Sequence, residues 1–547
     1  MWGEAVDALI IVVLGLLGIV AASTLGARIG VAAPLILVMA GIVVSLLPFV
    51  PAVDIDPEWI LAGVLPPLLY SASVSMPSME FRREFGAIGG LSVLLVVVSA
   101  LVLGAFFSWV IPGLGIWWGI ALGAIVSPTD AVATSIVKKL PVSPRVVSIL
   151  EGESLLNDAT ALVLLRTAIA GAAASVSLWS VLGKFAFAVV VAAVIGVVVG
   201  KVNLMVRARV TDSTVNTVIS FTVPFLAAIP AEELGASGLV AAVVAGLVTG
   251  YDAPRKLSPS HRLSDSQNWR TVELVLEGAI FLVMGLELSS IVDDVRVDHE
   301  GISTAVFVAA GALFLTILVR ALYVAPLLRA LQARAKFRER MKPRLSDIAN
   351  RLDNPEDYPP DERRRSRRRE PSANQMERFK IRVRRTVADI DYYLAAPLGW
   401  REGTIVIWAG MRGAVTLAAA QTLPEDTPSR SLLILVAFLV AAGSLILQGG
   451  TLKRVVVAVG PADQDLTSSE LDEHRRLLAL LEDASAGFVP PEGQSKKKTQ
   501  LDVIDAQRQA LLDARDDGLF DARMLGSALA ALDADQISLE LKGGPDG

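Results

Sequence analysis

The chain contains no cysteine and is poor in histidine, aromatic residues and charge. Its 547 residues include 3 histidines, 19% charged residues and 6% aromatic residues. The lack of cysteine excludes disulfide bonds and thiolate metal sites. The histidines, His261, His299 and His474, all fall in predicted loops or in the C-terminal tail. No serine–histidine pair is therefore expected inside an apolar segment, which argues against an intramembrane hydrolase.

Apolar residues fill most of the sequence. The hydrophobic fraction is 53% and the mean hydropathy is +0.56, far above the averages of soluble proteins. A helix needs roughly 20 residues to cross about 30 Å of hydrocarbon. We therefore predict an all-α membrane protein with about thirteen transmembrane helices. The expected spans are 5–26, 31–50, 58–76, 86–111, 115–138, 144–171, 177–207, 213–230, 235–250, 267–290, 302–330, 401–423 and 430–459.

The charges in the connecting loops alternate in sign along the chain. Basic residues follow the odd-numbered spans up to the ninth: Arg28; Arg82 and Arg83; Lys138, Lys139 and Arg145; Arg207 and Arg209; Arg255, Lys256 and Arg262. Three of the intervening loops are acidic: Asp54, Asp56 and Glu58; Glu232 and Glu233; Asp293, Asp294, Asp298 and Glu300. Because cytoplasmic loops accumulate Lys and Arg, we predict a multi-pass plasma-membrane protein with its N-terminus outside and its C-terminus in the cytosol.

Two polar segments interrupt or follow the apolar part. We predict a transmembrane domain over 1–460 that contains a cytosolic insertion at 331–399, and a cytosolic helical tail over 461–547. The insertion includes the basic run 363–369, and its composition favours partial disorder and contact with anionic lipid headgroups. The tail has a helical sequence pattern. We expect a cytosolic helical segment without a specific function, and the alternative is a segment that regulates transport or binds a partner.

Carboxylates are concentrated where the sixth span begins, in Glu151-Gly-Glu-Ser-Leu-Leu-Asn-Asp158. A charged side chain near the bilayer centre costs roughly 2.5–3.5 kcal/mol on insertion scales. On a helix, Ser154 and Asp158 lie on one stripe, and Glu153 and Asn157 lie on a neighbouring stripe. Carboxylate, hydroxyl and carbonyl oxygens are ligands that a small desolvated cation prefers. The helix therefore carries a candidate cation site.

The fifth span contains a break and another acid, in Ser127-Pro-Thr-Asp130. Proline removes a backbone donor and disfavours helix at the preceding residue. Broken backbone within a membrane is tolerated where it lines a cavity or is buried in protein. A simple proline kink is the plain alternative. The acid beside it favours a second half-site, in which the Thr129 hydroxyl, the Asp130 carboxylate and freed carbonyls are candidate contacts.

The twelfth span is interrupted in the same way by Gly410-Met-Arg412-Gly413. If spans one to six and eight to thirteen are inverted repeats, the fifth and twelfth spans are equivalent. Paired interruptions of this kind point to a transport site near the midplane. Asp130 and Arg412 would then offset the unlike dipole ends of crossed half-helices.

Other charges in the spans need partners. Arg320, in the eleventh span, either snorkels to the interface or pairs with an acid. Pairing with Glu153 would offset two costly charges and leave Asp158 free to titrate. Glu277, in the tenth span, is a weaker candidate for a proton or cation relay.

These motifs together resemble those of the monovalent cation:proton antiporter family, which includes the bacterial and animal sodium/proton exchangers. The motifs are Ser-Pro-Thr-Asp130-Ala, Glu-Gly-Glu153-Ser-Leu-Leu-Asn157-Asp158-Ala and Gly-Met-Arg412-Gly-Ala-Val, and their order fits over about 450 residues. The resemblance implies a homodimer in which each protomer has a dimerisation domain and a mobile core with crossed broken helices. It implies no cofactor, no nucleic-acid partner and no enzymatic activity.

The resemblance also assigns roles. Asp158 is implied to bind either the cation or a proton, and Ser154, Asp130 and Thr129 to help coordinate the transported ion. Asn157 matches the form that goes with electroneutral one-for-one exchange. Glu153 matches a structural acid that pairs with an arginine, here Arg320 in preference to Arg412. Ser71 departs from the pattern, because some relatives have an acid there, and this chain thus lacks one possible negative ligand.

The predicted function is exchange of a monovalent cation for H+ by alternating access. Na+ is the first choice of cation, and K+ and Li+ are alternatives. One carboxylate that holds either a proton or a cation couples the two gradients. A cation channel is the alternative, because acids and broken helices also line pores, and an uncoupled transporter is another. Cation-driven proton movement distinguishes the antiporter from both.

Overall fold

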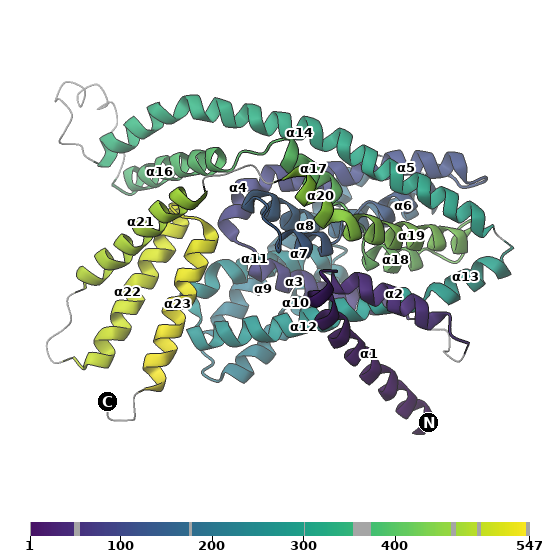
Figure 1. Cartoon of the computed structure of the whole chain (residues 1–547), viewed down its shortest axis with the longest axis horizontal. Coiled ribbons are helices and arrows are strands. Elements are labelled where there is room, and N and C mark those ends of the chain that lie inside the picture. The colour runs from purple at the N-terminus through teal and green to yellow at the C-terminus, as the bar shows by residue number, and fades with distance from the viewer. Residues whose placement is uncertain are drawn as a thin grey trace. The chain divides into compact units, whose positions relative to one another are not determined.

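The computed structural model describes residues 2–48, 55–173, 178–299, 301–353, 373–460, 466–488 and 494–542. All regular elements in these ranges are helices (Figure 1). The chain divides into two compact units. The first contains Met1–Ala325 and Arg401–Pro461, and the second contains Pro326–Trp400 and Ala462–Gly547.

The first unit contains most of the helices. They are α1 (Trp2–Ile29), α2 (Ala33–Ser45), α3 (Leu65–Ser75), α4 (Ser78–Gly89), α5 (Val96–Val110), α6 (Ile116–Val126), α7 (Val132–Val137), α8 (Pro144–Ala173), α9 (Leu178–Arg207), α10 (Ser213–Glu233), α11 (Gly238–Lys256), α12 (Pro259–Leu286), α13 (Leu288–Val297), the first part of α14 (Ile302–Asp353), α17 (Trp400–Trp408), α18 (Ala414–Gln421), α19 (Arg430–Ser444) and α20 (Gly450–Val459). Three π-helical segments extend or join them: Trp59–Val64 before α3, Gly90–Leu95 between α4 and α5, and Leu445–Gly449 between α19 and α20.

The apolar helices confirm the prediction of an all-helical membrane protein. Within the described residues, eight helical segments are long and apolar enough to cross a membrane: Leu9–Ile29, Ser78–Val110, Pro144–Ala172, Phe185–Arg207, Ser213–Glu233, Pro259–Val297, Ile302–Ile348 and Arg430–Val459. Shorter apolar helices occupy Ala33–Ser45, Trp59–Ser75 and Ile116–Val126. The count of thirteen spans and the inverted repeats stay predictions.

Small residues bring the helices of this unit close together. A Cβ atom on Gly123 of α6 would overlap the backbone of Ala100 in α5, and one on Gly196 of α9 would meet α11. Gly246 of α11 lies equally close to Tyr70 of α3. Helices in lipid gain stability from such close van der Waals packing, because no hydrophobic effect drives them together there. This packing holds α3 and α6, both next to the site described below.

Several charged residues predicted in loops are helical. Arg82 and Arg83, expected in the loop after the third span, lie within α4. Arg83 is buried, and so is the neighbouring Glu84, which accepts a hydrogen bond from Arg145 of α8 at 2.6 Å. Ion pairing within the protein compensates the buried Glu84, since a buried charge needs a partner.

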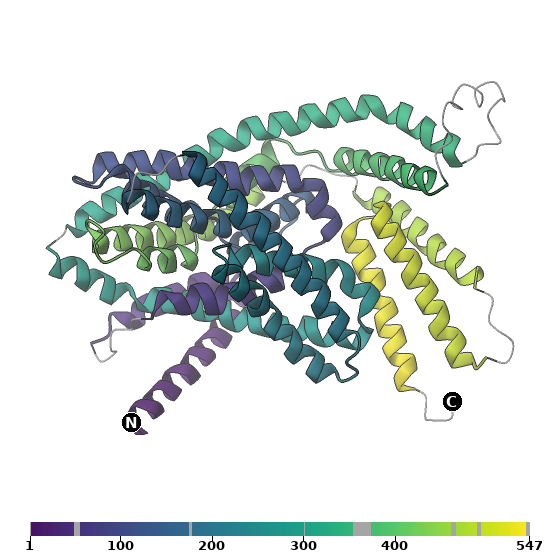
Figure 2. The same ribbon diagram turned by 180° about the vertical axis from the view of Figure 1, so that it is seen from behind.

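The second unit contains the last part of α14 together with α16 (Ala373–Ala395), α21 (Leu466–Ala486), α22 (Lys496–Asp517) and α23 (Ala522–Leu541). Helices α21, α22 and α23 lie side by side in both views (Figures 1 and 2). Their shared core is formed by Leu477, Ile504, Leu511, Ala514, Phe520, Leu525 and Leu532. The tail is therefore a packed helical bundle.

Both ends of the insertion are helical. Helix α14 continues to Asp353 and α16 spans Ala373–Ala395, and partial disorder of the insertion stays a prediction, because residues 354–372 lie outside the described part of the chain. Val383 and Ile390, seven residues apart on α16, are both buried. Helix α16 contacts α22 of the tail. Burial of these two apolar side chains offsets the high charge of the helix, Arg385 of α16 forms an ion pair with Asp517 of α22, and the basic run 363–369 lies outside the described residues.

Candidate functional site

Helices α6 and α7 are the two halves of one broken span. Residues 127–131 between them are not helical, as expected from Pro128, which lacks a backbone donor and restricts Ser127. Helices α17 and α18 form a second broken span around residues 409–413. The two breaks meet, because the backbone N–H of Asp130 donates a hydrogen bond to the Met411 carbonyl at 2.8 Å.

Arg412 lies at the C-terminal ends of two half-helices. Its guanidinium donates to the carbonyl of Val126, the last residue of α6, at 2.9 Å, and also to the carbonyl of Gly410, just after α17. The backbone N–H of Arg412 donates to the Ser444 hydroxyl at 2.8 Å. The last carbonyls of a helix lack helical partners and carry partial negative charge. The buried Arg412 therefore donates hydrogen bonds to free carbonyls at both helix ends and offsets their partial negative charge.

Asp130 lies at the N-terminal end of a half-helix. Its carboxylate accepts a hydrogen bond from the backbone N–H of Val132, the first residue of α7, at 3.1 Å. It also lies directly against Gly413, which precedes α18, since a Cβ atom at Gly413 would overlap it. Helix N-termini favour negative charge. Where the two broken spans meet, the acidic Asp130 thus lies at helix N-termini and the basic Arg412 lies at helix C-termini.

Side chains of α8 form hydrogen bonds with the first break, between α6 and α7. The Asn157 amide donates to the Thr129 carbonyl at 2.8 Å and to the Thr129 hydroxyl at 2.7 Å. That hydroxyl in turn donates to the Glu153 carboxylate at 3.0 Å. Glu153 also receives two hydrogen bonds from Arg320 of α14, at 2.5 and 2.8 Å. These side chains, each at least 90% buried, form one connected polar network.

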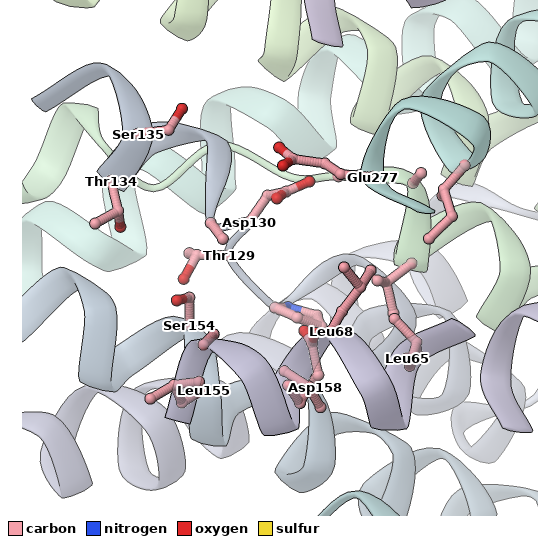
Figure 3. A pocket seen from close by; sticks show the side chains of 18 of the residues that line it. Leu65, Leu68, Thr129, Asp130, Thr134, Ser135, Ser154, Leu155, Asp158 and Glu277 are labelled. Atoms are coloured by element: carbon pink, nitrogen blue, oxygen red, sulfur yellow. The ribbon is translucent and has the colours of Figure 1, made fainter. Parts of the chain in front are cut away.

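A cavity of about 280 Å³ adjoins this network. Of the predicted ligands, Asp158, Ser154, Asp130 and Thr129 line it, and Figure 3 shows them around the same space. The Ser154 hydroxyl donates to the Glu151 carbonyl at 3.0 Å. Among the described residues, the Asp158 carboxylate has no hydrogen-bond donor or ion-pair partner. The cavity therefore contains an uncompensated acid next to hydroxyl oxygens.

Not every predicted residue contacts the cavity. Asn157, Glu153, Arg320 and Arg412 support its walls instead. Among the described residues, no group of three or more His, Cys, Asp or Glu side chains could hold a metal ion. The set predicted for Na+, Asp158, Asp130 and Ser154, has only two carboxylates, and its role in ion coordination stays a prediction.

Sequence reasoning missed part of the cavity wall. Glu273, which was not predicted, lines the cavity together with Glu277, the predicted relay candidate four residues further along α12. Figure 3 shows the Glu277 and Asp130 side chains pointing toward each other. Lys138 and Glu151 also line the cavity and form an ion pair. The four-residue spacing from Glu277, which puts both glutamates on one face of the helix, was the signal that could have identified Glu273.

Comparison with known proteins identifies the class of the protein. The family model described as sodium/hydrogen exchanger, transmembrane, matches residues 10–347 and 381–458. The chain belongs to this family of multi-pass membrane transporters, and the resemblance found in the motifs is confirmed.

Relatives and solved structures agree with this assignment. An uncharacterized Na+/H+ exchanger of Mycobacterium tuberculosis is 26% identical over 97% of this chain and 96% of its own length. A sodium, potassium, lithium and rubidium/H+ antiporter of Bacillus subtilis is 30% identical over 52% of this chain and 44% of its own length. The structure of the sodium proton antiporter MjNhaP1 from Methanocaldococcus jannaschii matches with a TM-score of 0.59 and 16% identity, over 84% of this chain and all of that one. The fold is therefore similar to that of a solved antiporter.

Proposed function

We propose that this protein exchanges a monovalent cation for H+, with Asp158 as the group that holds either one. The observation that carries the proposal is the Asp158 carboxylate, which lines a cavity without a hydrogen bond or ion pair among the described residues. A bound proton or a bound cation would each compensate that charge. Since one carboxylate cannot hold both, occupancy by one ion excludes the other, and the two fluxes are coupled.

The surrounding oxygens suit a small cation. Ser154 and Thr129 contribute hydroxyl groups and Asp130 a second carboxylate. Hard cations prefer such ligands. We infer Na+ as the first substrate, with K+ and Li+ as alternatives, because the named substrates of the Bacillus relative include all three.

The polar network behind the cavity supports this role for Asp158. Glu153 is neutralised by Arg320, and Asn157 is uncharged, so neither competes for the proton. We infer that one proton exchanges for one cation and that the cycle is electroneutral. We also infer a homodimer with its N-terminus outside and its C-terminus in the cytosol, in which the bundle with the crossed breaks moves during alternating access.

The test uses purified protein in liposomes with an imposed pH gradient. Wild-type protein is expected to collapse the gradient when Na+, K+ or Li+ is added, and an imposed voltage is expected to leave the initial rate unchanged. Asp158→Ala should abolish the response while the protein elutes as the wild type does. Asp293→Asn, at an exposed ion pair of α13, is the matched control and should transport normally.

Two results would contradict the proposal. Full cation-driven proton movement by Asp158→Ala would exclude Asp158 as the shared site. Cation flux without proton movement in the wild type would favour a channel or an uncoupled transporter.

A further inference from the structure

One wall of the cavity is closed by a contact between α3 and α12. The buried Ser71 hydroxyl of α3 donates a hydrogen bond to the Glu273 carboxylate of α12 at 2.5 Å, although 202 residues separate them. Glu273 lines the same cavity as Asp158. The contact thus brings a carboxylate of α12 to the side of the cavity that α3 forms.

In the described part of the chain, no basic side chain forms an ion pair with this wall, and Lys139 acts on Glu277 only as a nearby charge. Lys138 is the only basic residue that lines the cavity, among the described residues, and it pairs with Glu151. Neither Glu273 nor Glu277 forms an ion pair within the described part of the chain. A cavity lined by uncompensated negative charge raises the local concentration of cations. The Ser71 hydroxyl fixes one Glu273 oxygen and leaves the other free to bind.

We propose that Glu273, positioned by Ser71, binds the transported cation on the α3–α12 side of the cavity and sets the affinity for it. This inference rests on the proposed function, because it concerns the same cavity. A monovalent cation that keeps part of its hydration shell would be held there by carboxylate oxygen, the ligand type it prefers. Asp158 remains the group that exchanges cation for proton, and Glu273 adds charge without taking part in that exchange.

The kinetic test compares Na+ dependence in liposomes for four proteins. Glu273→Gln should raise the KM for Na+ about tenfold, the size of one lost charge contact, and should change the maximum rate less than about twofold. Ser71→Ala should give a smaller increase in KM, because the carboxylate stays but loses its positioning donor. Asp293→Asn removes an exposed acid outside the cavity and should leave KM unchanged.

Rescue makes the test specific to the position. The double variant Ser71→Glu with Glu273→Gln moves the carboxylate from α12 to α3 across their contact and should return KM to within about threefold of the wild type. An unchanged KM in folded Glu273→Gln would overturn the inference, and so would a double variant that retains the tenfold defect.

Calorimetric titration of Na+ into the purified protein separates this inference from the proposed function. If the wild type binds Na+ but drives no proton movement, antiport fails as the function, and weaker Na+ binding by Glu273→Gln still supports the cation-binding role. If Glu273→Gln binds Na+ as tightly as the wild type, the role of Glu273 is wrong even where antiport holds.

Discussion

Arg320 donates hydrogen bonds to both carboxylate oxygens of Glu153, a residue 167 positions earlier in the chain. The same guanidinium donates to the carbonyl of Val406 in α17 at 2.9 Å. Both charged side chains are about 98% buried. One ion pair therefore joins α8, α14 and the second broken span at the back of the cavity.

Breaking this pair should destabilise the fold. Glu153→Gln or Arg320→Met leaves a buried charge without its partner, which costs about 3–5 kcal/mol in free energy of unfolding. The double variant should recover a large part of this loss, because neither charge then remains. Equilibrium unfolding in mixed detergent measures all three. Arg166→Gln, at an exposed pair with Glu232, is the control and should cost less than about 1 kcal/mol.

Gly413→Ala should impair transport strongly. The added methyl group would occupy the space of the Asp130 carboxylate, so Asp130 would have to turn away from α7 and from the cavity. We expect exchange to fall by about two orders of magnitude, as for comparable misplacement of functional groups. Gly86→Ala, in α4 where a Cβ atom meets nothing within 4 Å, should transport like the wild type. Normal exchange by Gly413→Ala would show that Asp130 need not keep this position.

Asn157→Asp should destabilise the first break. The amide donates to the carbonyl and the hydroxyl of Thr129, whereas an aspartate would turn a carboxylate toward the carbonyl oxygen and lie near Glu153. A lost buried hydrogen bond of this kind costs about 1–3 kcal/mol. Thermal unfolding compared with wild type gives the effect. An increase in stability would mean that the amide orientation at Asn157 is reversed.

The stability of the first turn of α10 should depend on pH, because its N-cap residue is Asp212. The backbone N–H groups of Val215 and Thr214 donate to the Asp212 carboxylate and lower its pKa below the ordinary value. An acid with a lowered pKa in the folded state stabilises the fold above its unfolded pKa, about 3.9, and loses that contribution as pH falls through the folded value. Hydrogen-exchange protection at Thr214 and Val215 should therefore decrease below about pH 4.

Asp212→Asn provides the matched control for this effect. Asparagine caps a helix about as well as aspartate but does not titrate in this range. Its protection should stay constant over the same pH interval. If Asp212→Asn loses protection in parallel with the wild type, the change arises elsewhere in the protein.

Local chemistry made the breaks and the ion pair predictable. Pro128 lacks a donor, and Gly410 and Gly413 flank an arginine in an apolar span, so both interruptions follow from residue types. Glu153 and Arg320 are two costly charges that offset each other. No local rule predicts the Ser71–Glu273 contact, because it depends on how α3 and α12 rotate against each other, and the two residues lie 202 positions apart in the chain.

Helix α16 of the insertion shows a second limit of prediction from sequence. Its high charge favoured disorder, yet α16 buries Val383 and Ile390 and contacts α22. Two apolar positions seven residues apart are a weak signal among so many charges. Partner helices from a distant part of the chain decide whether such a segment folds.

The double role of Arg412 has a consequence for synthesis of the protein. The carbonyl of Val126 receives its donor only from a residue made 286 positions later, and the Met411 carbonyl that binds the Asp130 backbone is equally late. Chains are made from the N-terminus at about 5–20 residues per second, so the first break is synthesised at least about 14 seconds before its partner exists. A nascent chain therefore passes through a stage in which the Ser127–Asp130 segment needs water, lipid headgroups or an insertion factor to satisfy its backbone.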